Sequence, residues 1–163
     1  MFRDGSSPGS PAPHGISPLG RRTLVAAAWV LLCLALSQNL GATEGTFFIV
    51  VHAGVSEREL EPTFVADAFL KKRTRWPNGE AIRPVDQRRD APVRRYFSSS
   101  VLKRSVEAVR NYWQQRIFSG RDVPPPEADS DVSVLRYVQE NAGAIGYVAE
   151  APNVHGVRVI TLK

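Results

Sequence analysis

Hydrophobic residues after position 43 gather in short runs that predict β-strands. Apolar, β-branched and aromatic residues dominate FFIVVHAGV at 47–55, AIGYV at 144–148 and VRVITL at 157–162, and AIRPV at 81–85 is a shorter run of the same kind. Runs of this length are typical of strands, and the apolar character of the first predicts burial on both faces.

Between these runs, apolar residues recur every three or four positions, which predicts helices. One helix is expected from Pro62, where the missing N–H costs nothing, and another from about 91 to 102 with Asp90 as its N-cap. Ser105 and Ser130 are expected to cap two further helices.

The helix after Ser105 is expected to end at Gly120 and to turn one apolar stripe inward. The members of this stripe are Val106, Val109, Trp113 and Ile117. Strands interleaved with helices predict an α/β or α+β domain built around one sheet.

The N-terminal part of the chain has a different composition. Residues 1–20 are rich in Gly, Ser and Pro, with little to bury, which predicts disorder. Arg21 and Arg22 then precede an uncharged apolar run at 23–36. Its fourteen residues fall short of the roughly twenty that span a bilayer.

This layout predicts that residues 1–42 are a leader plus a secretory signal, cleaved after Ala42. The domain over 43–163 is then expected to be periplasmic or secreted, with no stable membrane span after cleavage. Three alternatives stay open: a twin-arginine signal, a lipoprotein signal at Cys33, and an uncleaved N-terminal anchor.

Charge and cysteine content narrow the function further. Residues 43–163 hold 18 of the 21 Lys and Arg and 15 of the 16 Asp and Glu, a net charge of +3. This mild charge, together with an export signal, argues against nucleic acid as a partner. The chain's only cysteine, Cys33, lies in the leader, so the domain is expected to have no disulfide.

The motifs of common enzymes are missing from the sequence. It has no His-x-x-x-His or Cys-x-x-Cys pair, no Gly-x-Ser-x-Gly elbow and no glycine-rich phosphate loop. We therefore expect no catalytic residue, metal or cofactor. His52 is expected to be a strand-end histidine bonded to backbone, and Trp76 and Trp113 to be core residues.

RPVDQRRDAPVRRYF at 83–97 carries five arginines in fifteen positions. Such a run has two interpretations. It is an anion-binding site at the start of a helix, where free N–H groups and arginine forks favour oxoanions. Alternatively, it is a helix with a solvated cationic face.

FLKKRTRWPNGEAIRPVDQRRDAPVRRYF at 69–97, followed by GAIGYV at 143–148, resembles the phosphate-binding proteins of ABC transporters. The resemblance covers nearly all of 47–163 and is closest to short, single-domain secreted members. It implies a periplasmic-binding-protein fold of type 2, here one α/β lobe with a central sheet flanked by helices. In full-length members, two lobes close on an oxoanion.

The resemblance also implies a ligand-binding loop at the start of the helix with Phe97. The residues at its ligand-binding positions are Gln87, Arg88, Arg89, Asp90, Ala91 and Val93. Asp90 is expected to cap the helix and orient the arginines rather than touch an anion.

The loop departs from the family pattern. Gln87 stands where relatives have Arg, and Arg89 where they have Asp. Ala91, Pro92 and Val93 replace Ser-Gly-Thr, so the hydroxyls and one N–H donor are lost. Because a single lobe does not wrap an anion, binding is expected to be weak and sensitive to salt.

Two functions follow. The first is a secreted, non-catalytic binding protein for phosphate or another oxoanion, with a transporter or envelope protein as partner. The second is a periplasmic accessory or interaction domain that kept the fold and lost the anion. In that case Arg94, Arg95, Arg104 and Arg110 form a contact surface or a solvated face.

Overall fold

The computed structural model of this chain describes residues 45–163. The predicted leader and signal sequence, the apolar run at 23–36 and Cys33 lie outside the described residues. In the described part, no helix combines the length and the apolar character needed to cross a membrane.

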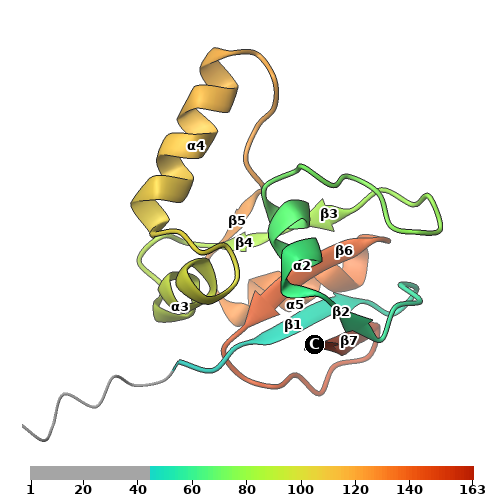
Figure 1. The fold of residues 1–163 in the computed structure, drawn as a ribbon. Helices are drawn as coiled ribbons and strands as arrows, with labels where there is room; N and C mark the ends of the chain where they lie inside the picture. The colour runs from blue at the N-terminus through green and yellow to red at the C-terminus, as the bar shows by residue number, and fades with distance from the viewer. Residues whose placement is uncertain (1–44) are drawn as a thin grey trace, which may run out of the picture. The chain divides into compact units, whose positions relative to one another are not determined.

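Residues 45–163 form strands interleaved with helices, as predicted (Figure 1). The strands are β1 (Phe48–His52), β2 (Glu59–Leu60), β3 (Arg83–Pro84), β4 (Asp86–Gln87), β5 (Glu127–Ala128), β6 (Ala144–Val148) and β7 (Val157–Leu162). The helices are α2 (Pro62–Phe69), α3 (Pro92–Ser100), α4 (Val106–Phe118) and α5 (Asp131–Glu140).

Five strands form one mixed sheet in the order β2-β7-β1-β6-β3. The central strand β1 runs antiparallel to both of its neighbours, β6 and β7. The short edge strands β2 and β3 run parallel to β7 and β6. β4 and β5 pair separately as a parallel two-stranded ribbon. The prediction of an α/β lobe with a central sheet flanked by helices is confirmed.

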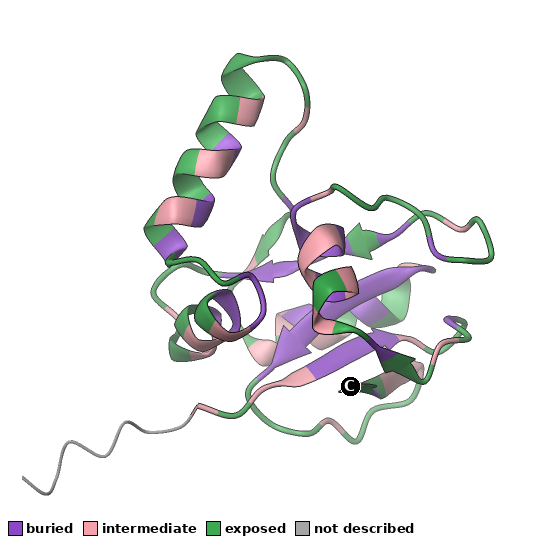
Figure 2. Ribbon diagram, in the orientation of Figure 1, coloured by how far each residue is buried: buried purple, intermediate pink, exposed green. Residues whose placement is uncertain are grey.

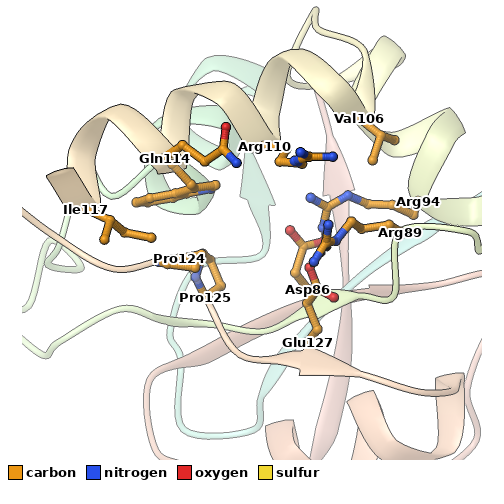
Figure 3. Close-up of a pocket in the computed structure, with 11 residues that line it drawn as sticks. Asp86, Arg89, Arg94, Val106, Arg110, Gln114, Ile117, Pro124, Pro125 and Glu127 are labelled. Atoms are coloured by element: carbon orange, nitrogen blue, oxygen red, sulfur yellow. Dashed lines mark ion pairs between the residues drawn. The ribbon is translucent and has the colours of Figure 1, made fainter.

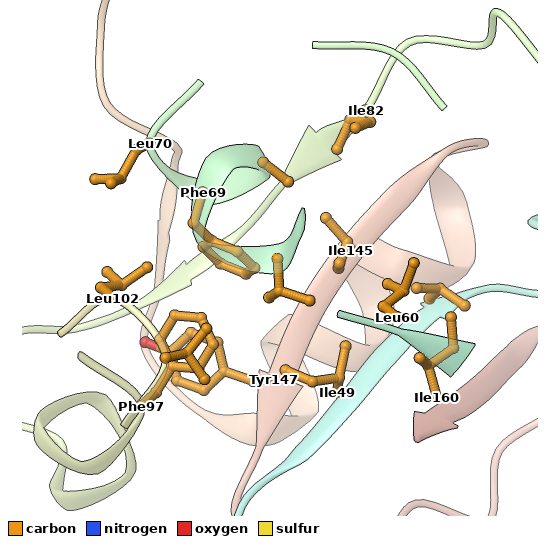
Figure 4. Close-up of a cluster of buried hydrophobic side chains, with 14 of the residues drawn as sticks. Ile49, Leu60, Phe69, Leu70, Ile82, Phe97, Leu102, Ile145, Tyr147 and Ile160 are labelled. Carbon is orange, nitrogen blue, oxygen red and sulfur yellow. The ribbon is translucent and has the colours of Figure 1, made fainter. Parts of the chain in front are cut away.

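The sheet is buried on both faces because its central strands alternate between two cores (Figure 2). On one face, Ile49, Val51 and Tyr147 pack with residues of α2, α3 and α4 (Figure 4). On the other face, Val50 packs against α5 through Val134. An apolar strand without polar alternation is therefore required at β1, as the sequence indicated.

The close approach of α5 to the sheet depends on Gly146 in the middle of β6. A Cβ built at this position meets Cγ1 of Val134 at 2.6 Å, closer than real side chains pack. Within the Gly-Ala-Ile-Gly-Tyr-Val stretch, Gly146 is therefore required for the packing of α5 against the sheet.

Local signals predicted several boundaries well. β6 and β7 coincide with the predicted strands. Ser105 caps α4 by accepting from the amide of Ala108, and Ser130 caps α5 in the same way from Ser133. His52 Nδ1 accepts the amide N–H of Gly54 at 3.0 Å, so its predicted backbone bond is confirmed.

Other expectations need correction. The strand predicted at 81–85 is reduced to β3, and the first strand is shorter than 47–55. No hydrophobic pattern predicts the two-residue strands β4 and β5. Ile117 is expected to face inward but is 49% exposed, whereas Val109 and Trp113 nearer the start of α4 are buried in the core.

Candidate functional site

The predicted anion loop lies between β4 and the start of α3. β4 pairs with β5, with the Asp86 amide donating to Pro126 O at 2.9 Å and the Arg88 amide to Ala128 O at 3.1 Å. This pairing brings the arginine-rich loop beside the proline-rich connection that follows α4. Two segments about forty residues apart in sequence thus form one surface.

Asp86 and Arg94 form a buried ion pair beneath this surface. The carboxylate of Asp86 contacts Nη1 of Arg94, and each side chain is almost fully buried. The Tyr147 hydroxyl donates to Asp86 Oδ1 at 2.5 Å, and the backbone N–H of Gln87 donates to the same oxygen at 2.9 Å. The interpretation of Arg94 as part of a solvated face is therefore wrong: its charge is needed inside, opposite Asp86.

Tyr147 connects this ion pair to the hydrophobic core. Its ring stacks on Phe97 of α3, with centroids 3.9 Å apart and planes 9° from parallel (Figure 4). Burial raises the pKa of the Tyr147 phenol well above its ordinary value, although the nearby Arg94 charge acts in the opposite direction. The phenol is therefore a hydrogen-bond donor at physiological pH. Burial also lowers the pKa of Arg94.

Gln87 points away from the arginines of the loop. It is 2% exposed, and its Nε2 donates to Asp131 Oδ1 at 2.5 Å and to Tyr147 O at 3.1 Å. Asp131 Oδ2 in turn accepts the Ala149 amide at 2.8 Å. Gln87 and Asp131 thus join β4, α5 and the end of β6. The Gln87 side chain therefore has a structural role.

The other predicted loop residues lie at the surface. Arg88 and Asp90 are both exposed and pair with each other, Nε to Oδ1 at 2.9 Å. Arg89 is also exposed, with its Nε 3.6 Å from Glu127 Oε1. An exposed pair of this kind contributes about 0–1 kcal/mol, so these arginines exchange partners easily.

The expected N-cap at Asp90 is wrong. The N-cap of α3 is Ala91, which makes no side-chain capping bond, and Pro92 follows in the first turn. The Ala91 amide donates to Arg88 O at 3.1 Å. Val93 carries the next backbone N–H of the first turn, where no earlier helical carbonyl accepts it.

A pocket of about 190 Å³ opens beside this loop (Figure 3). One face of α4, the proline-rich connection, β4 and the start of α3 form its walls. The residues that line it are Asp86, Arg89, Arg94, Val106, Arg110, Trp113, Gln114, Ile117, Pro124, Pro125 and Glu127. Of the six predicted ligand-binding residues, only Arg89 lines this pocket.

The pocket has a surplus of positive charge. Three arginines and two acids line it. Asp86 neutralises Arg94, and Glu127 lies near Arg89, but Arg110 forms no ion pair within the described part of the chain. Nε of Arg94 is buried and has no hydrogen-bond partner. The Arg110 guanidinium can therefore donate hydrogen bonds to an anion.

Sequence reasoning missed the contribution of α4 to the pocket. Arg110, Gln114 and Ile117 lie four and then three positions apart, so they share one helix face. That spacing indicates a shared helix face, but it does not indicate which segment of the chain lies opposite the helix. Among residues 45–163, no group of three or more His, Asp or Glu is placed to hold a metal ion.

Comparisons with known proteins identify the fold. A phosphate ABC transporter substrate-binding protein from Clostridium perfringens, solved with bound phosphate, aligns with a TM-score of 0.56 at 19% identity, over 70% of this chain and 43% of that chain. An ABC-type phosphate transport receptor from Vibrio cholerae aligns with a TM-score of 0.53 at 16% identity, over 70% and 44%. PstS from Borrelia burgdorferi aligns with a TM-score of 0.56 at 8% identity, over 72% and 47%.

The chain thus spans less than half the length of each of these structures. No protein-family profile matches the sequence, and neither does any curated protein. At these identities the likeness is one of fold. The resemblance to phosphate-binding proteins of ABC transporters, inferred from the sequence, is confirmed at that level. The first of the matched structures is named as a substrate-binding protein and the second as a transport receptor.

We predict that Arg94→Met lowers the free energy of unfolding by about 3–5 kcal/mol, because it leaves the buried Asp86 carboxylate unpaired. Arg95→Met is the matched control on the same helix turn. Arg95 is exposed and donates only to Asp90 O, so its loss should cost within about 0.5 kcal/mol. Urea unfolding followed by circular dichroism measures both.

Adding Asp86→Asn to Arg94→Met should recover part of the loss, because a neutral amide needs no opposite charge. Equal losses at the two arginines, or no recovery in the double variant, would contradict a buried ion pair as the main contribution.

Proposed function

We propose that this chain is a non-catalytic binding protein for a small oxoanion, with phosphate as the first expected ligand. The observation that carries the proposal is the pocket lined by Arg89, Arg94 and Arg110. These guanidinium groups come from three separate elements and lie around one space (Figure 3). Forked N–H donors of this kind suit carboxylate and phosphate oxygens.

The three arginines have different roles in this proposal. Arg94 is held by Asp86 and adds its positive charge at the wall of the pocket. Arg89 leaves its weak contact with Glu127 to meet the anion. Arg110 approaches from α4 with its charge uncompensated by any described residue. An anion therefore displaces one exposed ion-pair contact and leaves the buried pair intact.

The predicted loop residues contribute unequally. Arg89 meets the anion, whereas Arg88 and Val93 lie outside the lining of the pocket. Gln87 and Ala91 have their donors engaged within the protein and act by placing the loop. Asp90 acts by holding Arg88. With two acids at the pocket, binding is expected to be weak and to fall as salt rises.

Calorimetric titration of the purified full chain with phosphate and sulfate at low salt tests this proposal. We expect saturable binding that weakens at least tenfold in Arg89→Ala and in Arg110→Ala. Arg95→Ala, which removes an exposed arginine outside the pocket, should leave the affinity unchanged. Absence of heat at millimolar anion, or equal effects of all three substitutions, would contradict an anion site in this pocket.

We also propose that the domain is exported to the periplasm or secreted. The arginine pair, the apolar run at 23–36 and the small and polar residues that follow it support this location. In cells that express the full chain, the periplasmic fraction should contain a product whose N-terminus follows Ala42. Recovery of the uncut chain in the cytoplasmic fraction would contradict export, and the uncut chain in the membrane fraction would indicate an anchor.

A second function, as an interaction domain, is favoured by the end of α4. Phe118 is 90% exposed and Val123 is 60% exposed. Asp122 holds the loop between them by pairing with Lys71 at 3.2 Å, and Arg121 lies exposed beside Phe118. An apolar tip next to an exposed arginine fits a protein partner whose own apolar site has an acidic rim.

A photo-reactive residue at position 118 should crosslink one envelope protein much more strongly than the same residue at the exposed control position 115. With that partner purified, Phe118→Ser should weaken binding at least tenfold, and Arg121→Ala should reduce its salt dependence. Equal crosslinking from the two positions would rule out a docking site at this tip.

A further inference from the structure

The pocket beside the arginine loop has two chemically different ends. Figure 3 shows Arg89, Arg94, Asp86 and Glu127 together at one end, with Arg110 pointing toward them. Ile117, Pro124 and Pro125 lie at the other end, and Trp113 lines the wall from α4. A site for a bare inorganic ion does not require such an apolar wall.

The apolar end is held in place. The proline-rich connection is bound at one end by the β4–β5 ribbon, where Asp86 N donates to Pro126 O. At its other end, Asp122 pairs with Lys71 at 3.2 Å and lies 3.9 Å from Arg116 of α4. Consecutive prolines stiffen the segment between these two attachments. The wall is therefore preformed and not a mobile loop.

The size of the pocket also separates ligand classes. About 190 Å³ is several times the roughly 30 Å³ that one water occupies in the liquid. It is smaller than the roughly 300–1,000 Å³ pockets that hold drug-sized molecules. A tetrahedral oxoanion that bonds to the arginines leaves the space along Trp113 and the prolines unfilled. A ligand with a body of about one phenyl ring fills both parts.

We propose that the pocket binds a small organic anion, a phosphate ester or carboxylate with an apolar body, in preference to inorganic phosphate. Its charged group bonds to Arg110 and Arg89, beside the buried pair of Arg94 and Asp86. Its apolar body packs between Trp113 and Pro124, with Ile117 at the edge. This inference rests on the proposed anion-binding function and names the class of ligand.

Paired titrations with inorganic phosphate and phenyl phosphate test the inference on the purified full chain. We expect phenyl phosphate to bind at least tenfold more tightly, because its ring removes apolar surface from water. Benzyl alcohol, which has the ring without the charge, should bind more weakly than phenyl phosphate by a similar factor.

Two variants assign the two ends of the pocket. Ile117→Ser changes a half-exposed side chain, so the fold should tolerate it, and it should reduce the preference for phenyl phosphate at least threefold. Arg110→Ala should weaken both anions alike. Gln115→Ala, on the exposed face of the same helix, is the matched control and should alter neither affinity.

The outcomes separate this inference from the function on which it rests. Equal affinity for the two phosphates, with both weakened by Arg110→Ala, would overturn the organic ligand and leave the oxoanion function standing. A preference for phenyl phosphate that survives Ile117→Ser would place the apolar contact elsewhere and also overturn the inference. No binding of either anion at millimolar concentration would overturn both.

Discussion

The buried ion pair between Asp86 and Arg94 is the constraint on which the site depends. A guanidinium group is costly to bury unless a charge and hydrogen bonds compensate it, and here Asp86 does so while Tyr147 donates to the same carboxylate. The three residues belong to β4, α3 and β6. Once they meet, both ends of the loop at 88–91 are fixed, and the pairing of β4 with β5 holds the loop beside the proline-rich connection.

This constraint divides the arginine run into parts that sequence proximity conceals. Arg94 is turned inward, and Arg95 donates to the backbone of Asp90, which also binds Arg88. Of the arginines in the loop and in α3, Arg89 and Arg94 line the pocket. The charge that faces them comes from Arg110, on another helix. Arginines that are adjacent in sequence therefore lie apart in space, and arginines that are distant in sequence lie close together. The number of arginines in a short stretch of sequence is thus a poor indicator of an anion-binding site.

The sequence predicted the parts of the fold that local chemistry determines. The strands β6 and β7 and the two serine caps follow from apolar runs and from the need of free N–H groups for an acceptor. The β4–β5 ribbon and the burial of Arg94 depend on partners far along the chain or across a turn, and no periodicity encodes them. Asp90 had the right chemistry for a cap, but Arg88 takes its carboxylate. Ile117 has the right spacing for a core residue, but it lies at the pocket and is half exposed.

The attachment of the pocket wall through Asp122 bears on how acid would affect binding. Burial alone would raise the pKa of Asp122, but the amide of Val123 and the charges of Lys71 and Arg116 outweigh it and lower the pKa below its usual range. The stabilisation from a lowered pKa is complete above the unfolded value of about 3.9 and is lost only as pH falls through the folded one. None of the residues that line the pocket is a histidine. Between about pH 5 and 7 the second negative charge of a phosphate ester titrates, with a pKa near 6, while the Asp122 attachment of the wall keeps its charge. A change of affinity in that window therefore reports the charge of the ligand rather than the loss of this attachment.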